Sequence, residues 1–313
     1  MTLDALGVAI RFALYLDLMA AFGLAAFGVL SLRGSERGTA LPLRPVMVDA
    51  GALGIVLSVL GLLVMAAAMA GVPLTAIDRG TVTMLVTETA AGAAWIVRMA
   101  ALALVVLVPM MGWKRPGWAL SVIALAGGVA IATLAWTGHG EMDDGAIGWL
   151  HLCADIAHLI AAGVWIGALL GLSMLVMRRA SRIDASHLAL SHRALEGFSI
   201  TGTVMVVVIV VSGLINSWLL VGLAGMRVIG DSLYGQLLVA KVMVFVAMIG
   251  LASVNRYLLT PALEAAIDQG NHARAIGALR RSLGLETACA VAVLGIVAWL
   301  GTLEPIASAA GSS

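Results

Sequence analysis

Eight runs of about 20 apolar residues recur along the 313-residue chain, and this pattern limits its possible folds more than any other feature. A helix of ~20 residues crosses the ~30 Å hydrocarbon core of a bilayer. Lipid offers no partners for backbone groups, and the alternation typical of barrel strands is absent, so the runs must be helices. We therefore predict an all-α polytopic transmembrane bundle, a single integral membrane domain over residues 1–313. Its helices are expected near residues 5–32, 46–70, 86–111, 118–137, 148–177, 196–223, 233–257 and 283–303.

Composition supports a membrane protein and excludes several functional classes. Only 11% of the residues are charged and 62% are hydrophobic, whereas soluble domains carry about 25% charged residues. Cys153 and Cys289 lie in separate apolar runs, which argues against a disulfide framework or thiolate metal site. The start of the chain lacks the basic region of a signal peptide, so the first run is expected to be retained. No nucleotide-binding loop, nucleophile elbow or basic patch occurs, so we expect neither an enzyme nor a nucleic-acid partner.

The short loops predict the orientation of the bundle. Thirteen Lys and Arg residues fall in the first, third, fifth and seventh connections, and two fall in the second and sixth. Because positive loops stay on the cytoplasmic side, both termini are expected on the periplasmic side of a bacterial inner membrane. The acidic loop 138–147 is then periplasmic.

The longest connection, residues 260–282, has an amphipathic pattern. Its apolar positions are Leu263, Ala266, Ile267, Ile276 and Leu279. We expect an interfacial helix on the cytoplasmic side, with a partner-docking helix as the alternative.

Three of the six histidines lie in one stretch that begins at the fourth run and continues into the fifth. His151, Asp155 and His158 are spaced i, i+4 and i+7, so a helix presents them on one face. Trp165 continues that face. Gly163, Gly167 and Gly171 fall on roughly the opposite side, a spacing that lets another helix approach closely.

His139 ends the fourth run, at a height close to the start of the fifth. We therefore take His139, His151, Asp155 and His158 as candidate metal ligands, since intramembrane ionisable residues tend to mark functional sites. Imidazole with carboxylate suits copper(II), zinc or similar metals, and imidazole with thioether suits copper(I). The alternative is structural: a membrane histidine is often an interhelical hydrogen-bonder, and Lys241 at a similar depth could neutralise Asp155.

Methionines form a weaker candidate site near the same face of the membrane. Met65 and Met69 stand one turn apart in the second run, and Met84 and Glu88 share a stripe of the third. They could form a soft entry site for copper(I), but methionine is also an ordinary filler of membrane helices. Their membership of a metal pathway stays open.

A combination of motifs resembles the CopD family of copper resistance inner-membrane proteins. The chain carries Trp136-Thr-Gly-His139, then Asp155-x-x-His158-x-x-Ala161-Ala-Gly-x-Trp165-x-Gly167. Further along come Leu233-Tyr-Gly-Gln-Leu-Leu with Lys241, Asn255-Arg-Tyr-x-x-Thr-Pro261, and Arg281-Ser-x-x-x-Glu286. The resemblance covers most of the chain from about residue 136 and is weaker before it.

The resemblance implies a protein of copper homeostasis that carries Cu(I) or Cu(II) and works with a periplasmic copper-binding partner of the CopC type. His139, Asp155 and His158 match the polar positions of the family, whereas His151 is added from geometry. Proteins grouped with this family include haem proteins, so ligation of haem by two histidines is one alternative. The other is a docking or sensing subunit that transports nothing. Direction, oxidation state and driving force stay open.

Overall fold

The computed structural model describes residues 3–137, 145–177, 185–225, 229–268, 273–304 and 306. Within these ranges the chain is helical and contains no strand, so the expected all-α bundle is confirmed. Eight helices of the described chain are long and apolar enough to cross a membrane. They are built on α1 (Leu3–Leu30), α3 (Leu43–Ala70), α5 (Ala90–Met111), α6 (Pro116–Ala132), α7 (Gly145–Val176), α8 (Ala185–Gly225), α9 (Leu233–Val254) and α11 (Ala273–Leu300).

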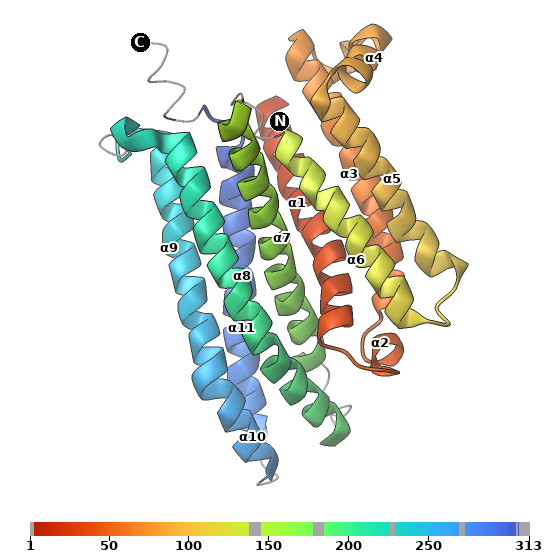
Figure 1. Ribbon diagram of the computed structural model, residues 1–313, viewed down its shortest axis with the longest axis vertical. Coiled ribbons are helices and arrows are strands. Elements are labelled where there is room, and N and C mark those ends of the chain that lie inside the picture. Colours follow the sequence, from red (N-terminus) through yellow and green to blue (C-terminus); the bar gives the residue numbers. More distant parts are fainter. Residues whose placement is uncertain are drawn as a thin grey trace.

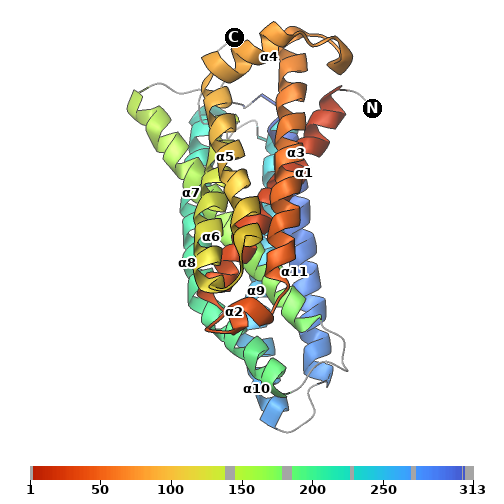
Figure 2. The same cartoon turned by 90° about the vertical axis from the view of Figure 1, so that its right-hand side faces the viewer.

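The bundle is organised around α1 and α7 (Figures 1 and 2). Helix α1 packs on α3, α6, α7 and α11, and α7 packs on α8 and α11 as well. By contrast, α8 and α9 bury the smallest share of their apolar windows, so their outer faces are left for lipid. Helix α1 begins, and α11 ends, at one end of the bundle, which we call the terminal end (Figure 1).

Glycines bring α1 and α7 into direct backbone contact. A Cβ placed on Gly167 would lie 1.9 Å from the carbonyl carbon of Gly23, and one on Gly23 would lie 2.2 Å from the oxygen of Gly163. A Cβ on Gly171 would meet the ring of Phe27 at 2.4 Å. The glycine face predicted for α7 is therefore the seat of α1, because side chains larger than hydrogen would force the helices apart.

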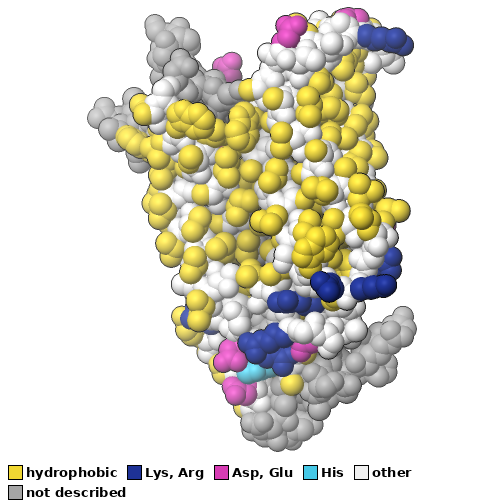
Figure 3. Space-filling view, turned by 45° about the vertical axis from the view of Figure 1, so that its right-hand side comes forward, with side chains coloured by type: hydrophobic (Ala, Val, Ile, Leu, Met, Phe, Trp, Pro, Cys, Tyr) yellow, Lys and Arg dark blue, Asp and Glu magenta, His cyan; other side chains and the backbone are white. Residues whose placement is uncertain are grey.

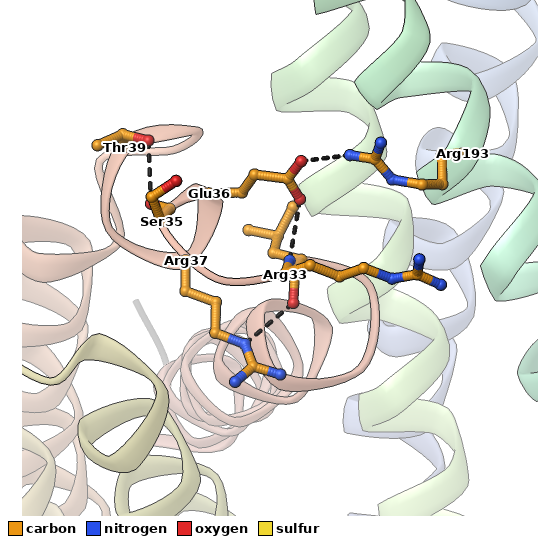
Figure 4. Close-up of polar contacts among 7 residues, drawn as sticks. Arg33, Ser35, Glu36, Arg37, Thr39 and Arg193 are labelled. Atoms are coloured by element: carbon orange, nitrogen blue, oxygen red, sulfur yellow. Dashed lines mark hydrogen bonds and ion pairs between the residues drawn. The ribbon is translucent and has the colours of Figure 1, made fainter.

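The other end of the bundle, which we call the basic end, is held by arginines. The short helix α2 (Glu36–Thr39) places Glu36 against Arg193 of α8 in an ion pair, and Arg33 N donates to Glu36 Oε2 at 2.9 Å (Figure 4). Arg37 Nε donates to Leu32 O at 2.9 Å. Lys and Arg side chains gather at this end below a broad apolar surface (Figure 3). This apolar surface is the part of the molecule that suits contact with lipid acyl chains.

The third predicted span is interrupted at its start. Helix α4 (Arg79–Glu88) ends where Thr89 takes extended dihedral angles, and the Thr89 hydroxyl accepts from Gly92 N to cap α5. A Cβ on Gly92 would lie 2.1 Å from Leu85 O, so the tight corner between the two helices requires glycine there. The span therefore begins at Ala90, after a separate helix at the terminal end (Figure 2).

The stretch from residue 255 to residue 282 also departs from a simple loop. One π-helical turn (η5, Asn255–Leu259) joins α9 to α10 (Thr260–Asp268), and α11 already begins at Ala273. Leu263, Ile276 and Leu279 are buried in the main hydrophobic core. The apolar side of this stretch thus packs on the bundle. The last helix begins before the predicted run 283–303 and so includes part of this stretch.

Candidate functional site

One face of α7 carries the candidate ligands that the structure describes. His151, Asp155 and His158 all line a single cavity of about 170 Å³, which we call the histidine cavity. Helices α1, α8, α9 and α11 form its other walls, through residues that include Arg11, Tyr15, Asn216, Tyr234, Lys241 and Leu300. The i, i+4, i+7 spacing therefore does place the three side chains together, close to the terminal end.

His158 is oriented by a serine of the neighbouring helix. Its Nδ1 lies 3.0 Å from Oγ of Ser212 on α8, and that hydroxyl donates its own proton to Val208 O at 2.5 Å. A hydroxyl has one proton to give, so while Ser212 donates to Val208 O its oxygen can only accept from the ring of His158. In that arrangement Nδ1 of His158 carries the ring proton, and the Nε2 lone pair is available to a cation.

Asp155 is held one turn further toward the terminal end. Asn216, one turn from Ser212 on α8, donates from Nδ2 to Asp155 Oδ1 at 3.4 Å. The Oδ1 of Asn216 is buried and accepts no hydrogen bond within the described parts of the chain. Ser212 and Asn216 of α8 thus pair with His158 and Asp155 of α7. The imidazole of His158, the carboxylate of Asp155 and the amide of Asn216 line one cavity.

Lys241 supplies the countercharge in this cavity. It lies on α9 and lines the histidine cavity together with Asp155 and His151. A carboxylate within the bundle is costly without a cation, so a charged Lys241 in the same cavity lowers the cost of ionising Asp155 when no metal is present. The structural alternative, in which Lys241 neutralises Asp155, is thus compatible with their place in one cavity.

Two more cavities follow the histidine cavity along α7. A middle cavity of about 320 Å³ shares His158 and Lys241 with it. The middle cavity also reaches Trp165, which lines a third cavity of about 260 Å³ toward the basic end. We call the third the glutamate cavity, because Glu286 of α11 forms part of its wall. The three cavities therefore lie in a row from one end of the bundle toward the other.

The glutamate cavity contains a polar cluster that was not predicted from the sequence. The indole of Trp165 donates to Glu286 Oε1 at 3.1 Å, and Asn255 Nδ2 donates to Glu286 Oε2 at 2.8 Å. These residues come from α7, η5 and α11, so no local spacing connects them. The sequence signals were that Glu286 and Asn255 are polar residues within apolar runs and that all three residues fall in the motifs that resemble the family.

The remaining candidate ligands are more scattered. His139 and the acidic residues of loop 138–144 lie outside the described residues. Met65 packs in a small apolar cluster with Leu85 and Trp95, whereas Met69 and Met84 are exposed. Among the described residues, no three His, Cys, Asp or Glu side chains are arranged to hold a metal ion. His151, Asp155 and His158 share a cavity without forming such a cluster by themselves.

Comparison with known proteins agrees with the family suggested by the motifs. Residues 1–149 match the family described as copper resistance protein D-like, N-terminal domain, and residues 192–300 match the family copper resistance protein D. A protein named copper resistance protein D from Pseudomonas syringae pv. tomato is 44% identical over 306 residues, which cover 96% of this chain and 97% of that protein. No solved structure matches. The chain therefore belongs to the copper resistance protein D family.

Proposed function

We propose that this protein moves copper ions across the bacterial inner membrane, with copper as its cargo. The observation that carries the proposal is the histidine cavity, where the free Nε2 of His158 and the carboxylate of Asp155 face the same space. Imidazole and carboxylate are ligands that copper accepts. Membership of the copper resistance protein D family supports copper over the other metals that such ligands suit.

The row of cavities supports transport over static storage. His158 and Lys241 line the first and second cavities, and Trp165 lines the second and third. An ion leaving the histidine cavity toward the basic end would pass along a single face of α7. The spacing of His151, Asp155, His158 and Trp165 along that face gives a polar contact every one to two turns.

Asp155 alternates between two cations in this proposal. Without copper, the charge of Lys241 balances the carboxylate. When copper binds to His158 and Asp155, the ion replaces that balance, and Lys241 is left as a positive charge beside the site. Repulsion between Lys241 and the bound ion then keeps binding reversible, which a transport site requires and a storage site does not.

The positive-inside rule assigns the two ends of the bundle. The basic end is cytoplasmic and the terminal end, with the histidine cavity, is periplasmic. Copper would then enter from a periplasmic copper-binding protein of the CopC type, received by the acidic loop and by His139. We propose transport and no catalysis.

Haem ligation fits the described geometry less well. Two axial ligands approach the iron from opposite faces, and His151 and His158 project from the same face of α7, so a haem would need His139 paired with one of them, and His139 lies outside the described residues. The histidine cavity, at about 170 Å³, is also smaller than the ~300–1,000 Å³ of pockets for cofactor-sized ligands. An absorbance spectrum of the purified protein tests this alternative, because bound haem gives a Soret band.

Copper content of cells that express the protein tests the proposal. We expect His158→Ala to abolish the change in copper content that the wild type produces. The matched control is His192→Ala, because His192 lies at the basic end and pairs with Glu264 at 3.7 Å. Equal copper content in cells expressing the wild type and His158→Ala, at equal protein levels, would contradict the proposal.

Ser212→Ala tests the tautomer argument separately. Loss of the hydroxyl removes the acceptor that fixes the Nδ1 proton of His158, while the imidazole itself stays. Groups that orient metal-ligating histidines typically contribute ~10–100-fold to metal affinity. We expect a loss in that range for copper, measured against a competing chelator. Unchanged affinity would remove Ser212 from the site.

A further inference from the structure

The carboxyl group of Glu286 lies inside the bundle without a cationic partner. The residue is 3% exposed, and its two oxygens accept from Trp165 Nε1 and Asn255 Nδ2. It forms no ion pair with any Lys, Arg or His in the described part of the chain. An ionised carboxylate in such a place is costly, and carrying a proton removes the charge.

Asn255 can hydrogen-bond to this carboxyl group in its ionised or its protonated state. It is 7% exposed, and its Oδ1 accepts no hydrogen bond from any described residue. It starts the π-helical turn η5, a rare feature that is frequent at functional sites. An amide donates through its nitrogen and accepts through its oxygen. The N–H therefore binds the carboxylate, and a rotated amide presents Oδ1 to the acid O–H.

The glutamate cavity links Glu286 to the basic end. Besides Glu286 and Asn255, its walls carry the exposed residues Thr203, Arg256 and Tyr257. The guanidinium of Arg256 binds Ser199 O at 3.3 Å and Thr203 Oγ1 at 2.5 Å, and it stacks on Tyr257. It is thus engaged at the mouth of the cavity, away from Glu286.

The other walls bring no further charge to this carboxyl group. The side chains that α7, α8, α9 and α10 contribute to the cavity are neutral, so Arg256 and Tyr257 are its other titratable lining residues. Arg280, which precedes Glu286 on α11, donates to Val176 O at 2.8 Å, and Arg11 of α1 binds Gly301 at the terminal end. A proton that enters the cavity from the basic end can therefore bind to the carboxyl group of Glu286. Asn255 can hydrogen-bond to that group in both its ionised and its protonated state.

We propose that Glu286 is a proton-binding site that exchanges its proton with the basic end of the protein through the glutamate cavity. Water in the cavity delivers the proton to Oε2, where an O–H bond forms, and takes it back when that bond breaks. Asn255 changes from donor to acceptor in the same step, and the Trp165 hydrogen bond to Oε1 persists in both states. The site does not depend on copper transport.

Infrared difference spectroscopy of the copper-free protein in lipid nanodiscs tests the site. A pH titration of the wild type should show the C=O stretch of a protonated carboxyl group, with a shift in D₂O because the proton exchanges. The part of this band that belongs to Glu286 should be missing in Glu286→Gln, whose amide oxygen still accepts from Trp165. It should remain in Glu264→Gln, a control at an exposed glutamate of the same end. A titrating band of equal size in Glu286→Gln and the wild type would overturn the proposal.

A second variant leaves the carboxyl group in place. Trp165→Phe removes the donor to Oε1, so the C=O band assigned to Glu286 should move to higher frequency while still titrating. An unmoved band would overturn the assignment even if Glu286→Gln failed to fold. Because every sample is free of copper, failure of copper transport in cells would leave this result unaffected.

Discussion

The contact between α1 and α7 yields the most quantitative prediction, through Gly167→Ala. The added methyl carbon would lie 1.9 Å from the backbone of Gly23, whereas ordinary contact begins at 3.4 Å. The two backbones must therefore part by roughly 1.5 Å, the difference between those distances. A gap of ~0.5–1 Å already forfeits a quarter to a half of the dispersion energy between facing atoms.

The expected cost follows from two opposing effects. Overpacking typically costs ~1–3 kcal/mol, and the upper end applies because backbone, not a flexible side chain, must move. Alanine gains ~1 kcal/mol over glycine in a helix interior, which offsets part of that cost. We expect a net loss of about 2 kcal/mol in the free energy of unfolding.

Denaturation of the protein in mild detergent, followed by circular dichroism, measures this loss. The matched control is Gly250→Ala on α9, where an added methyl group meets nothing within 4 Å. That variant should be as stable as the wild type or gain up to ~1 kcal/mol. If Gly167→Ala and Gly250→Ala unfold at the same denaturant concentration, close backbone packing does not hold α1 on α7.

Two other predictions concern charges. Asp155→Asn should destabilise the protein, because it leaves Lys241 in the same cavity without its countercharge, and adding Lys241→Met should restore most of that loss. A double variant no more stable than Asp155→Asn in the same melt would show that the two charges do not compensate each other. At the terminal end, hydrogen bonds from the hydroxyl and amide of Thr81 hold the pKa of Asp78 below its usual value. This cap on α4 is complete above the ordinary pKa of aspartate, ~3.9, and is lost as pH falls through the lowered value. Hydrogen exchange of the first α4 amides should accelerate in that acidic range, after correction for the intrinsic rate, and in Asp78→Ala at any pH.

The sequence predicted features that depend on spacing along one helix. The lengths of the apolar runs gave the eight spans, because the bilayer sets how long a spanning helix must be. The glycine and histidine faces of α7 followed from its helical period. In the structure one face seats α1 at Gly23, and the other lines the histidine cavity.

Features that depend on which helices meet could not be predicted in this way. Trp165, Asn255 and Glu286 stand on three elements far apart in the chain, and only the packing of α7, η5 and α11 brings them together. The proton on Nδ1 of His158 depends likewise on Ser212 of α8. The corner at Thr89 was not predicted, because a single threonine within an apolar run does not mark the end of a helix. His139, which depends on the neighbouring loop, lies outside the described residues.

The sparse burial of α8 and α9 has a consequence for the environment of the site. These helices form one side of the histidine and middle cavities, and Leu214 and Val246, which line the middle cavity, are exposed, as are Trp218 and Met243 outside it. On that side at most a single layer of protein separates the cavities from acyl chains. The bilayer is then effectively the second layer of the wall, and its thickness and lateral pressure act on the spacing of Ser212 and Lys241 from α7. Copper affinity should therefore vary with lipid chain length, as it would not for a site enclosed by protein on every side.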